Sequence, residues 1–175
     1  YLKITDSKKE IFKLSGGMYI ARQMIENKLK ESFFIEQAMV IGENEKFASA
    51  LIVPNFSYIE QWFSPKGISF NGKEELINHP EVQSIIQKEV VEVNKTLGQV
   101  EEIKRFRLVP DDWSPDTGEM SPTLKLKRHH IAKQYSTIIE EIFSSQQEEN
   151  GNGKKLKIYY LVNFSYCQSI IFAPI

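Results

Sequence analysis

The stretch Gln37-Ala-Met-Val-Ile-Gly-Glu-Asn-Glu-Lys-Phe-Ala-Ser-Ala-Leu-Ile-Val53 contains two apolar segments separated by a polar turn. Gly42 and the polar residues after it are typical of a turn between antiparallel strands. Pro54 ends the second segment, because proline cannot donate a hydrogen bond to a sheet. The sequence therefore predicts a hairpin with strands at Gln37–Ile41 and Phe47–Val53. We expect these two strands to form the centre of the sheet.

Strand-forming residues recur on both sides of this hairpin. Leu2–Thr5 and Ile11–Leu14 flank the charged segment Asp6–Glu10, which predicts a second hairpin with a charged turn. Gly16-Gly17 ends the second strand of that pair. Lys104–Val109 is predicted to be a further strand.

Helical periodicity follows the strands. After Ile20, Ile25 and Leu29 share one face, whereas Glu26 and its charged neighbours lie on the others, and this helix is expected to end near Ser32. A second helix is predicted to begin at Pro80 and to end before Gly98, with these apolar positions at helical spacing: Val82, Ile86, Val93 and Leu97. A last helix is predicted from a similar apolar stripe: Ile131, Tyr135, Ile138 and Ile142. Strands and helices interspersed around one small sheet, with hairpins flanked by helices, predict the α+β class.

The composition is that of one globular domain. The chain has 175 residues, 41% of them hydrophobic, and a net charge of −1, so it has no overall bias toward nucleic acid or membrane. Its single cysteine, Cys167, excludes an internal disulfide and favours a reducing cytoplasm. No apolar run reaches the roughly 18 to 20 residues that span a bilayer. The chain begins at Tyr1 within a strand-like pattern, so we expect it to be a piece of a larger protein.

The segment Ser121-Pro-Thr-Leu-Lys-Leu-Lys-Arg128 lies between a loop, Asp111–Gly118, and the last predicted helix. This position lets Lys125 extend outward, and Pro122 restricts the backbone that carries it. A flexible ammonium is suited to a phosphate whose negative charge grows during a reaction. The alternative interpretation is a solvated basic surface beside a helix start.

A second segment, near the start of the chain, narrows the interpretation of the Lys125 segment. Asp6-Ser-Lys-Lys-Glu-Ile-Phe-Lys-Leu-Ser-Gly-Gly17 is similar to the pattern D-R-K-K-D/E-x-x-K-x-x-x-G, and the Lys125 segment is similar to S/T-P-T-x-K-x-x-R. Together they resemble the C-terminal lid domain of the adenylate-forming enzymes, and most closely that of the AMP-forming long-chain fatty acid–CoA ligases. The resemblance implies a lid domain over residues 1–145. A polar linker at 146–157 and an unassigned apolar tail at 158–175 follow it.

The resemblance also implies roles for individual residues. Lys125 is the expected catalytic lysine of adenylate formation, and Lys9 is the expected hinge. Ser15, Gly16 and Gly17 are expected to line the coenzyme A channel, because small residues let the narrow pantetheine arm pass close to the backbone. Weaker nucleotide contacts are expected from Ser7 and Lys13.

This sequence departs from the family pattern at three positions. Ser7 stands where the family usually has arginine, and Met18 stands where a basic residue is common, so each loses a charge. Leu124 precedes the lysine where many relatives have glycine. These differences leave Lys125 itself in place.

The implied reaction uses ATP, Mg²⁺ and coenzyme A to convert a fatty acid first to an acyl-adenylate and then to acyl-CoA. No glycine-rich phosphate loop precedes a lysine in this chain, so ATP and the fatty acid are expected to bind mainly to the protein's own N-terminal domain. We expect this fragment to be inactive alone. We also expect no metal site within it, because its histidines lack ligand partners and are interpreted as surface residues: His79, His129 and His130.

Two other functions remain open. A related lid domain could serve a carrier protein with a bound phosphopantetheine. The sequence of the segment Lys8-Lys-Glu-Ile-Phe-Lys13, however, favours the CoA ligases. A nucleic-acid-binding module would use the basic cluster from Lys125 to His130, but nearby acidic residues oppose it, and we expect no nucleic acid partner: Asp111, Asp112, Asp116 and Glu119. Peripheral association of the full enzyme with the inner face of the membrane is a third open point.

Overall fold

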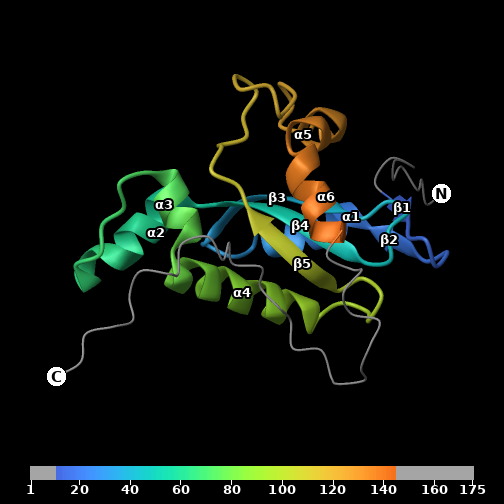
Figure 1. The fold of residues 1–175 in the computed structure, drawn as a ribbon, viewed down its shortest axis with the longest axis horizontal. Helices are drawn as coiled ribbons and strands as arrows, with labels where there is room; N and C mark the ends of the chain where they lie inside the picture. The colour runs from blue at the N-terminus through green and yellow to red at the C-terminus, as the bar shows by residue number, and fades with distance from the viewer. Residues whose placement is uncertain (1–10, 145–175) are drawn as a thin grey trace, which may run out of the picture.

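The computed structural model describes residues 11–144, and Figure 1 shows how their elements are arranged. The expected strand Leu2–Thr5, the residues Ser7 and Lys9, and the segments 146–157 and 158–175 lie outside this range. The strands are β1 (Ile11–Lys13), β2 (Tyr19–Ala21), β3 (Ile35–Ile41), β4 (Ala48–Pro54) and β5 (Ile103–Leu108). The helices are α1 (Arg22–Leu29), α2 (Phe56–Phe63), the short 3-10 helix η2 (Ser64–Lys66), α3 (Lys73–Asn78), α4 (Pro80–Asn94), α5 (Arg128–Gln134) and α6 (Ser136–Ser144).

The larger sheet contains β3, β4 and β5 in that order. β3 pairs antiparallel with β4, with Ala38 opposite Ile52, which confirms the predicted hairpin. β5, which confirms the strand expected near Lys104–Val109, joins the other side of β4 in parallel, with Phe106 opposite Ala50. The expectation that both hairpin strands are central is therefore wrong for β3. A parallel partner needs a crossover, here through α2, α3 and α4, and this crossover brings β5 beside β4 and leaves β3 at the edge.

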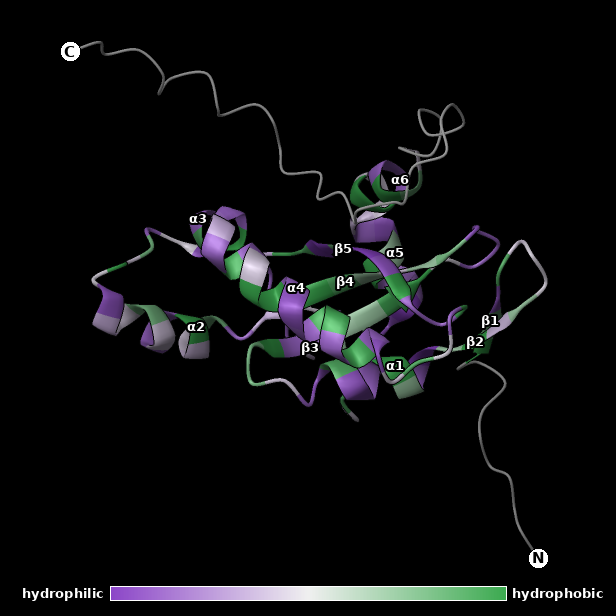
Figure 2. Ribbon diagram, turned by 90° about the horizontal axis from the view of Figure 1, so that it is seen from below, coloured by the Kyte–Doolittle hydropathy of each residue, from purple (hydrophilic) through white to green (hydrophobic). Residues whose placement is uncertain are grey.

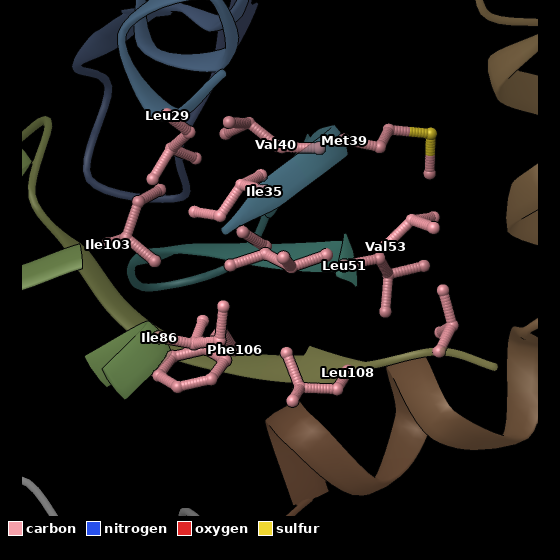
Figure 3. Close-up of a cluster of buried hydrophobic side chains, with 14 of the residues drawn as sticks. Leu29, Ile35, Met39, Val40, Leu51, Val53, Ile86, Ile103, Phe106 and Leu108 are labelled. Carbon is pink, nitrogen blue, oxygen red and sulfur yellow. The ribbon is translucent and has the colours of Figure 1, made fainter. Parts of the chain in front are cut away.

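The middle strand β4 is buried at every position, as is typical of a strand covered on both faces. Figure 1 shows α4 on one face of the sheet and α5 and α6 on the other. Figure 3 shows Leu51 and Val53 of β4 in one apolar cluster with Ile86 of α4 and Phe106 of β5. Figure 2 shows hydrophobic residues along β4 but a mixture of hydrophobic and hydrophilic residues along α4, as expected for a helix with one buried face.

The turn between β3 and β4 requires glycine at its first position. Gly42 has a φ of +133°, and a Cβ there would lie 2.6 Å from the backbone oxygen of Phe47. Asn44 also has a positive φ, of 64°, which asparagine tolerates better than most residues. The local sequence thus determines the shape of this turn.

β1 and β2 form a separate two-stranded sheet, which we call the glycine hairpin (residues 11–21). The strand predicted at Ile11–Leu14 is β1, which ends one residue earlier at Lys13, and in the described residues its partner is β2, with Phe12 opposite Ile20. Gly17, with a φ of +86°, lies in the turn and donates its N–H to the oxygen of Leu14 at 2.9 Å. The glycine pair therefore not only ends β1 but also turns the chain back into β2.

Helix α1 confirms the predicted helix after Ile20, although it ends at Leu29, before Ser32. Ile25 and Leu29 are fully buried, as expected. The expected exposure of Glu26 is wrong, because its side chain is only 1% exposed. A buried carboxylate requires charged or hydrogen-bonding partners, and its partners come from distant parts of the chain.

The helix predicted after Pro80 is confirmed as α4, which buries Val82, Ile86 and Val90, although it ends at Asn94 and not at Gly98. The single helix predicted over Ile131 to Ile142 is instead two helices, α5 and α6, that meet at Tyr135. Tyr135 leaves the helical conformation, with φ −103° and ψ 23°, while its hydroxyl donates to Asp111 at 2.6 Å. The break accompanies this tertiary contact, and periodicity alone does not reveal it. Within residues 11–144, no helix combines the length and apolar character needed to cross a bilayer.

Candidate functional site

Lys125 lies in a tight loop that we call the lysine hairpin (residues 119–127). Met120 and Leu126 form an isolated antiparallel bridge at its base. At the tip, Ser121 N–H donates to the Lys125 oxygen at 2.8 Å, and Lys125 N–H donates to Ser121 Oγ at 3.1 Å. Lys127 N–H donates to the Glu119 oxygen at 2.7 Å. The backbone on both sides of Lys125 is thus fixed, while the residue itself is exposed.

The tip has the geometry of a three-residue hairpin loop. Leu124 N–H donates to the Ser121 oxygen at 2.8 Å, which closes a β-turn with Pro122 at its second position. Leu124 then adopts a left-handed conformation, with φ +58°. A turn followed by one left-handed residue is a common way to close such a loop, and glycine is favoured at that position. The glycine that the resemblance places at the position of Leu124 would suit this left-handed conformation.

We expect Leu124→Gly to leave the free energy of unfolding unchanged or to raise it by up to about 1 kcal/mol. The left-handed conformation costs an L-residue roughly 1–2 kcal/mol, and glycine removes this cost. Part of the benefit is lost, because glycine has more backbone freedom to lose when the chain folds. The Leu124 side chain is 67% exposed, so little packing is lost. Leu124→Val should lower the free energy of unfolding instead, because a β-branched residue is worse at positive φ. Urea unfolding of the chain measures both. Equal destabilisation by Gly and Val would contradict this description of the loop.

The loop that leads into the lysine hairpin is anchored to the helices. Trp113 is buried, and its ring nitrogen donates to the Tyr135 hydroxyl at 3.4 Å. Burial, followed by the hydrogen bond that Tyr135 donates to Asp111, raises the pKa of Tyr135, so this side chain stays neutral. Ser114 and Thr117 make reciprocal side-chain and backbone hydrogen bonds around the next turn, with a 2.9 Å contact between their hydroxyl oxygens. These contacts fix the chain before it reaches Glu119.

A hollow of about 380 Å³ lies beside this loop. Asp111, Asp112, Glu119 and Lys73 are among its lining residues. Lys73 pairs with Asp112, and Asp111 accepts the Tyr135 hydroxyl. Burial disfavours the charged form of Glu119, but nearby hydrogen-bond donors, that of Thr117 foremost, favour the charged form and lower the pKa of Glu119. Asp111 and Asp112 are therefore each engaged by another side chain, and Glu119 belongs to the base of the lysine hairpin.

The arginine of the Lys125 segment is engaged in an ion pair. Arg128 donates from Nη1 and Nη2 to the two carboxylate oxygens of Glu26, at 2.6 and 2.8 Å. Lys125, Lys127, His129 and His130 are exposed. Arg128 is the only arginine between Lys125 and His130, and its guanidinium is paired with Glu26. This basic cluster therefore has no guanidinium left to contact the phosphates of a nucleic acid.

The glycine hairpin holds the other expected site residues. Ser15 and Gly16 are exposed at its turn, and Ser15 N–H donates to the Glu45 oxygen at 2.9 Å. Gly16 has open space around it, since a Cβ there would meet no atom within 4 Å. Lys13 lies beside Gly17, with its Cε 3.8 Å from where a Gly17 Cβ would be. The turn of the glycine hairpin thus has open space around Gly16 and lies next to the charged side chain of Lys13.

The two hairpins are well separated in the structure. Figure 1 shows β1 and β2 at one end of the molecule and the chain between β5 and α5, which carries Lys125, rising from the sheet elsewhere. The structure therefore brings Lys13, Ser15, Gly16 and Gly17 together but does not place Lys125 among them. Within one domain these are two distinct surfaces.

No group of three or more His, Cys, Asp and Glu side chains in residues 11–144 has the arrangement of a metal site. His129 and His130 are exposed, as interpreted from the sequence. His79 differs from that interpretation, because it is only partly exposed and its ring packs edge-on against Phe63 and Phe70.

Sequence reasoning missed three supporting residues: Glu26, Asp111 and Tyr135. The charge of Glu26 suggested a solvated helix face, and its partner Arg128 is 102 positions away. Tyr135 was assigned to an apolar helix stripe, and Asp111 to acidic residues that oppose nucleic acid. No local spacing marks such pairs, although an arginine beside a candidate catalytic loop commonly pairs with a carboxylate.

The sequence matches the family model described as AMP-binding enzyme C-terminal domain over residues 10–147. It is 32% identical over 147 residues to the long-chain-fatty-acid–CoA ligase FadD15 of Mycobacterium tuberculosis, covering 83% of this chain and 24% of that protein. It is 35% identical over 148 residues to long-chain-fatty-acid–CoA ligase 1 of Homo sapiens, covering 82% of this chain and 21% of that protein. The chain thus spans about a fifth to a quarter of the length of these curated relatives.

Solved structures show the same fold. The adenylation domain of the carboxylate reductase from Mycobacterium chelonae matches with a TM-score of 0.63 at 20% identity, covering 79% of this chain and 20% of that chain. The A domain of the carboxylic acid reductase from Segniliparus rugosus, in complex with AMP and a co-purified carboxylic acid, matches with a TM-score of 0.64 at 19% identity, covering 81% of this chain and 21% of that chain. The expected α+β class, with its small sheets and flanking helices, is thereby confirmed.

Proposed function

Because the chain belongs to the family of AMP-binding enzyme C-terminal domains, we propose that it is the mobile lid of a long-chain fatty acid–CoA ligase. Relatives at 32–35% sequence identity that are named as long-chain ligases support this choice of substrate. The remaining three quarters or more of such a protein would hold the ATP and fatty acid sites. The lid itself supplies groups that approach those sites.

The observation that carries the proposal is the lysine hairpin: an exposed Lys125 on a backbone fixed by hydrogen bonds on both sides. In the first half-reaction, a fatty acid carboxylate oxygen attacks the α-phosphorus of ATP and pyrophosphate leaves. Negative charge builds on the oxygens between carboxylate and phosphate. A long, flexible ammonium on a rigid support can meet that charge with little reorganisation of the protein.

Residues 11–144 offer no group of carboxylates and imidazoles suited to Mg²⁺. We therefore assign the ion to the triphosphate of ATP on the large domain, and no step on the lid depends on it. Lys13 and Ser7 are proposed as nucleotide contacts, Lys13 from the exposed side of β1 and Ser7 from outside the described residues.

In the second half-reaction, the coenzyme A thiolate attacks the acyl carbonyl of the adenylate and AMP leaves. We propose that the lid rotates about Lys9, which lies outside the described residues, so that the glycine hairpin replaces the lysine hairpin at the active site. The separation of the two hairpins in Figure 1 supports a rotation, because one orientation cannot easily bring both surfaces to the same reacting atoms. Ser15, Gly16 and Gly17 would then border the pantetheine path.

The carrier-protein alternative rests on the carboxylate reductase neighbours, which share the fold at about 20% identity. Sequence identity to the CoA ligases is higher and covers a similar part of the chain. We therefore favour free coenzyme A as the thiol substrate. The single cysteine, which favours a reducing compartment, supports a cytoplasmic enzyme.

The chain alone should fold but release no pyrophosphate from ATP with Mg²⁺ and palmitate, because it lacks the surfaces that bind both substrates. The same assay on a full-length ligase that contains this lid should show palmitate-dependent pyrophosphate release. Turnover by the purified chain would contradict the assignment as a lid. A full-length protein that transferred the acyl group to a carrier protein but not to coenzyme A would favour the alternative.

A further inference from the structure

Glu26 is the most completely buried charged side chain that contacts the Lys125 segment. Its carboxylate is 1% exposed and accepts three hydrogen bonds: two from Arg128, at 2.6 and 2.8 Å, and one from the Val40 N–H, at 2.8 Å. The arginine side chain is 23% exposed. A bidentate pair of this kind fixes both the distance and the relative orientation of the two groups.

The ion pair joins parts of the chain that are far apart in sequence. Glu26 belongs to α1, and Val40 belongs to β3, one of the two edge strands of the larger sheet. Arg128 is the first residue of α5 and follows Lys125 by three positions. The chain that leaves the lysine hairpin is therefore attached, through one carboxylate, to the edge of the rigid sheet.

The other end of the lysine hairpin is held by different contacts, through Trp113 and Tyr135. The exposed tip itself packs against little, since Leu124 and Lys125 are both exposed. The direction in which Lys125 projects thus depends on its two anchors. Of these, the Glu26–Arg128 pair is the nearer to Lys125 in the chain.

We propose that Glu26 and Arg128 are positioning residues that aim Lys125 at the reacting phosphate. This inference rests on the proposed function, and it adds two residues that act through Lys125 rather than on the substrate. A displacement of about 1 Å at a catalytic group can cost on the order of a hundredfold in rate, so loss of the bidentate geometry should reduce adenylate formation.

The test uses Arg128→Lys in the full-length ligase, which keeps the charge but cannot make two parallel hydrogen bonds. We expect kcat for acyl-adenylate formation to fall about tenfold or more, with KM for ATP and fatty acid little changed. Thioester formation from supplied acyl-adenylate should be unchanged. The control is Lys66→Met, which removes an exposed ion pair with Glu81 far from the hairpin and should alter neither step. Equal losses in both half-reactions for Arg128→Lys would indicate a merely structural pair and overturn the proposal.

A double variant, Glu26→Leu with Arg128→Met, covers the case in which single variants fail to fold, because apolar replacement of a whole buried pair is often tolerated. It should fold and yet form adenylate slowly, and full adenylation activity would overturn the inference. Combining Lys125→Ala with Arg128→Lys should add no further loss of adenylation, because the arginine acts through the lysine. If Lys125→Ala lowers adenylation but Arg128→Lys does not, the positioning proposal alone fails. If neither lowers it, the proposed function of the lysine fails as well.

Discussion

Lys125→Ala in the full-length ligase should lower the rate of acyl-adenylate formation by about 10² to 10³, the range seen when one preorganised donor to a developing negative charge is removed. The substitution leaves the backbone of the lysine hairpin intact, because Lys125 makes its hydrogen bonds to Ser121 there through its own main-chain N–H and carbonyl oxygen. Palmitate-dependent exchange of labelled pyrophosphate into ATP measures this step directly.

Lys127→Ala is the matched control for that experiment. Lys127 is also exposed and lies two positions further along the same hairpin, so its loss changes the net charge equally. We expect adenylate formation to stay within about twofold of the unchanged enzyme, since an exposed charge away from the reacting atoms contributes little. Similar, mild effects of both substitutions would show that the segment is an ordinary basic surface.

Gly16→Leu should have the opposite selectivity. The added side chain occupies the uncrowded edge of the glycine hairpin, so thioester formation should fall by about 10- to 100-fold, the rate equivalent of roughly 1–3 kcal/mol of steric conflict. Adenylate formation should be unchanged. Gly16 is a better probe than Gly17, because Gly17 has a φ of +86° and any side chain there strains the backbone as well.

Gly16→Ala is the size control for this prediction. A methyl group at an open position should leave both half-reactions nearly unchanged, as no atom lies within 4 Å of the new Cβ. The experiment compares the rate of acyl-CoA formation from purified palmitoyl-adenylate with the rate of pyrophosphate exchange. An unchanged thioester step in Gly16→Leu would remove this residue from the coenzyme A path.

The elements that the sequence predicted well are those with local signals. The β3–β4 hairpin follows from apolar strands around Gly42, where only glycine avoids a 2.6 Å approach to a backbone oxygen. Helix α4 follows from Pro80 and a regular apolar stripe. In these segments the turn residues and the periodicity agree with the tertiary structure, so reasoning over a short window is sufficient.

The features that were missed depend on partners distant in the sequence. The edge position of β3 is set by the parallel pairing of β5 with β4, which no pattern within β3 reveals. Likewise, the burial of Glu26 depends on Arg128, and the break at Tyr135 accompanies its hydrogen bond to Asp111. For the candidate site, motif resemblance located Lys125 and the glycine pair. Their support by tertiary contacts became visible only in the structure.

In the proposed mechanism, Lys125 serves adenylate formation and is away from the reacting atoms during thioester formation. The most direct test is single-turnover formation of palmitoyl-CoA from bound palmitoyl-adenylate and coenzyme A by the Lys125→Ala ligase. We expect a rate within about threefold of the unchanged enzyme, because in the proposed mechanism the glycine hairpin, a separate surface of the lid, faces the active site during the thioester step. A fall as large as the loss of adenylate formation would contradict the claim, since it would mean that Lys125 remains at the reacting atoms throughout.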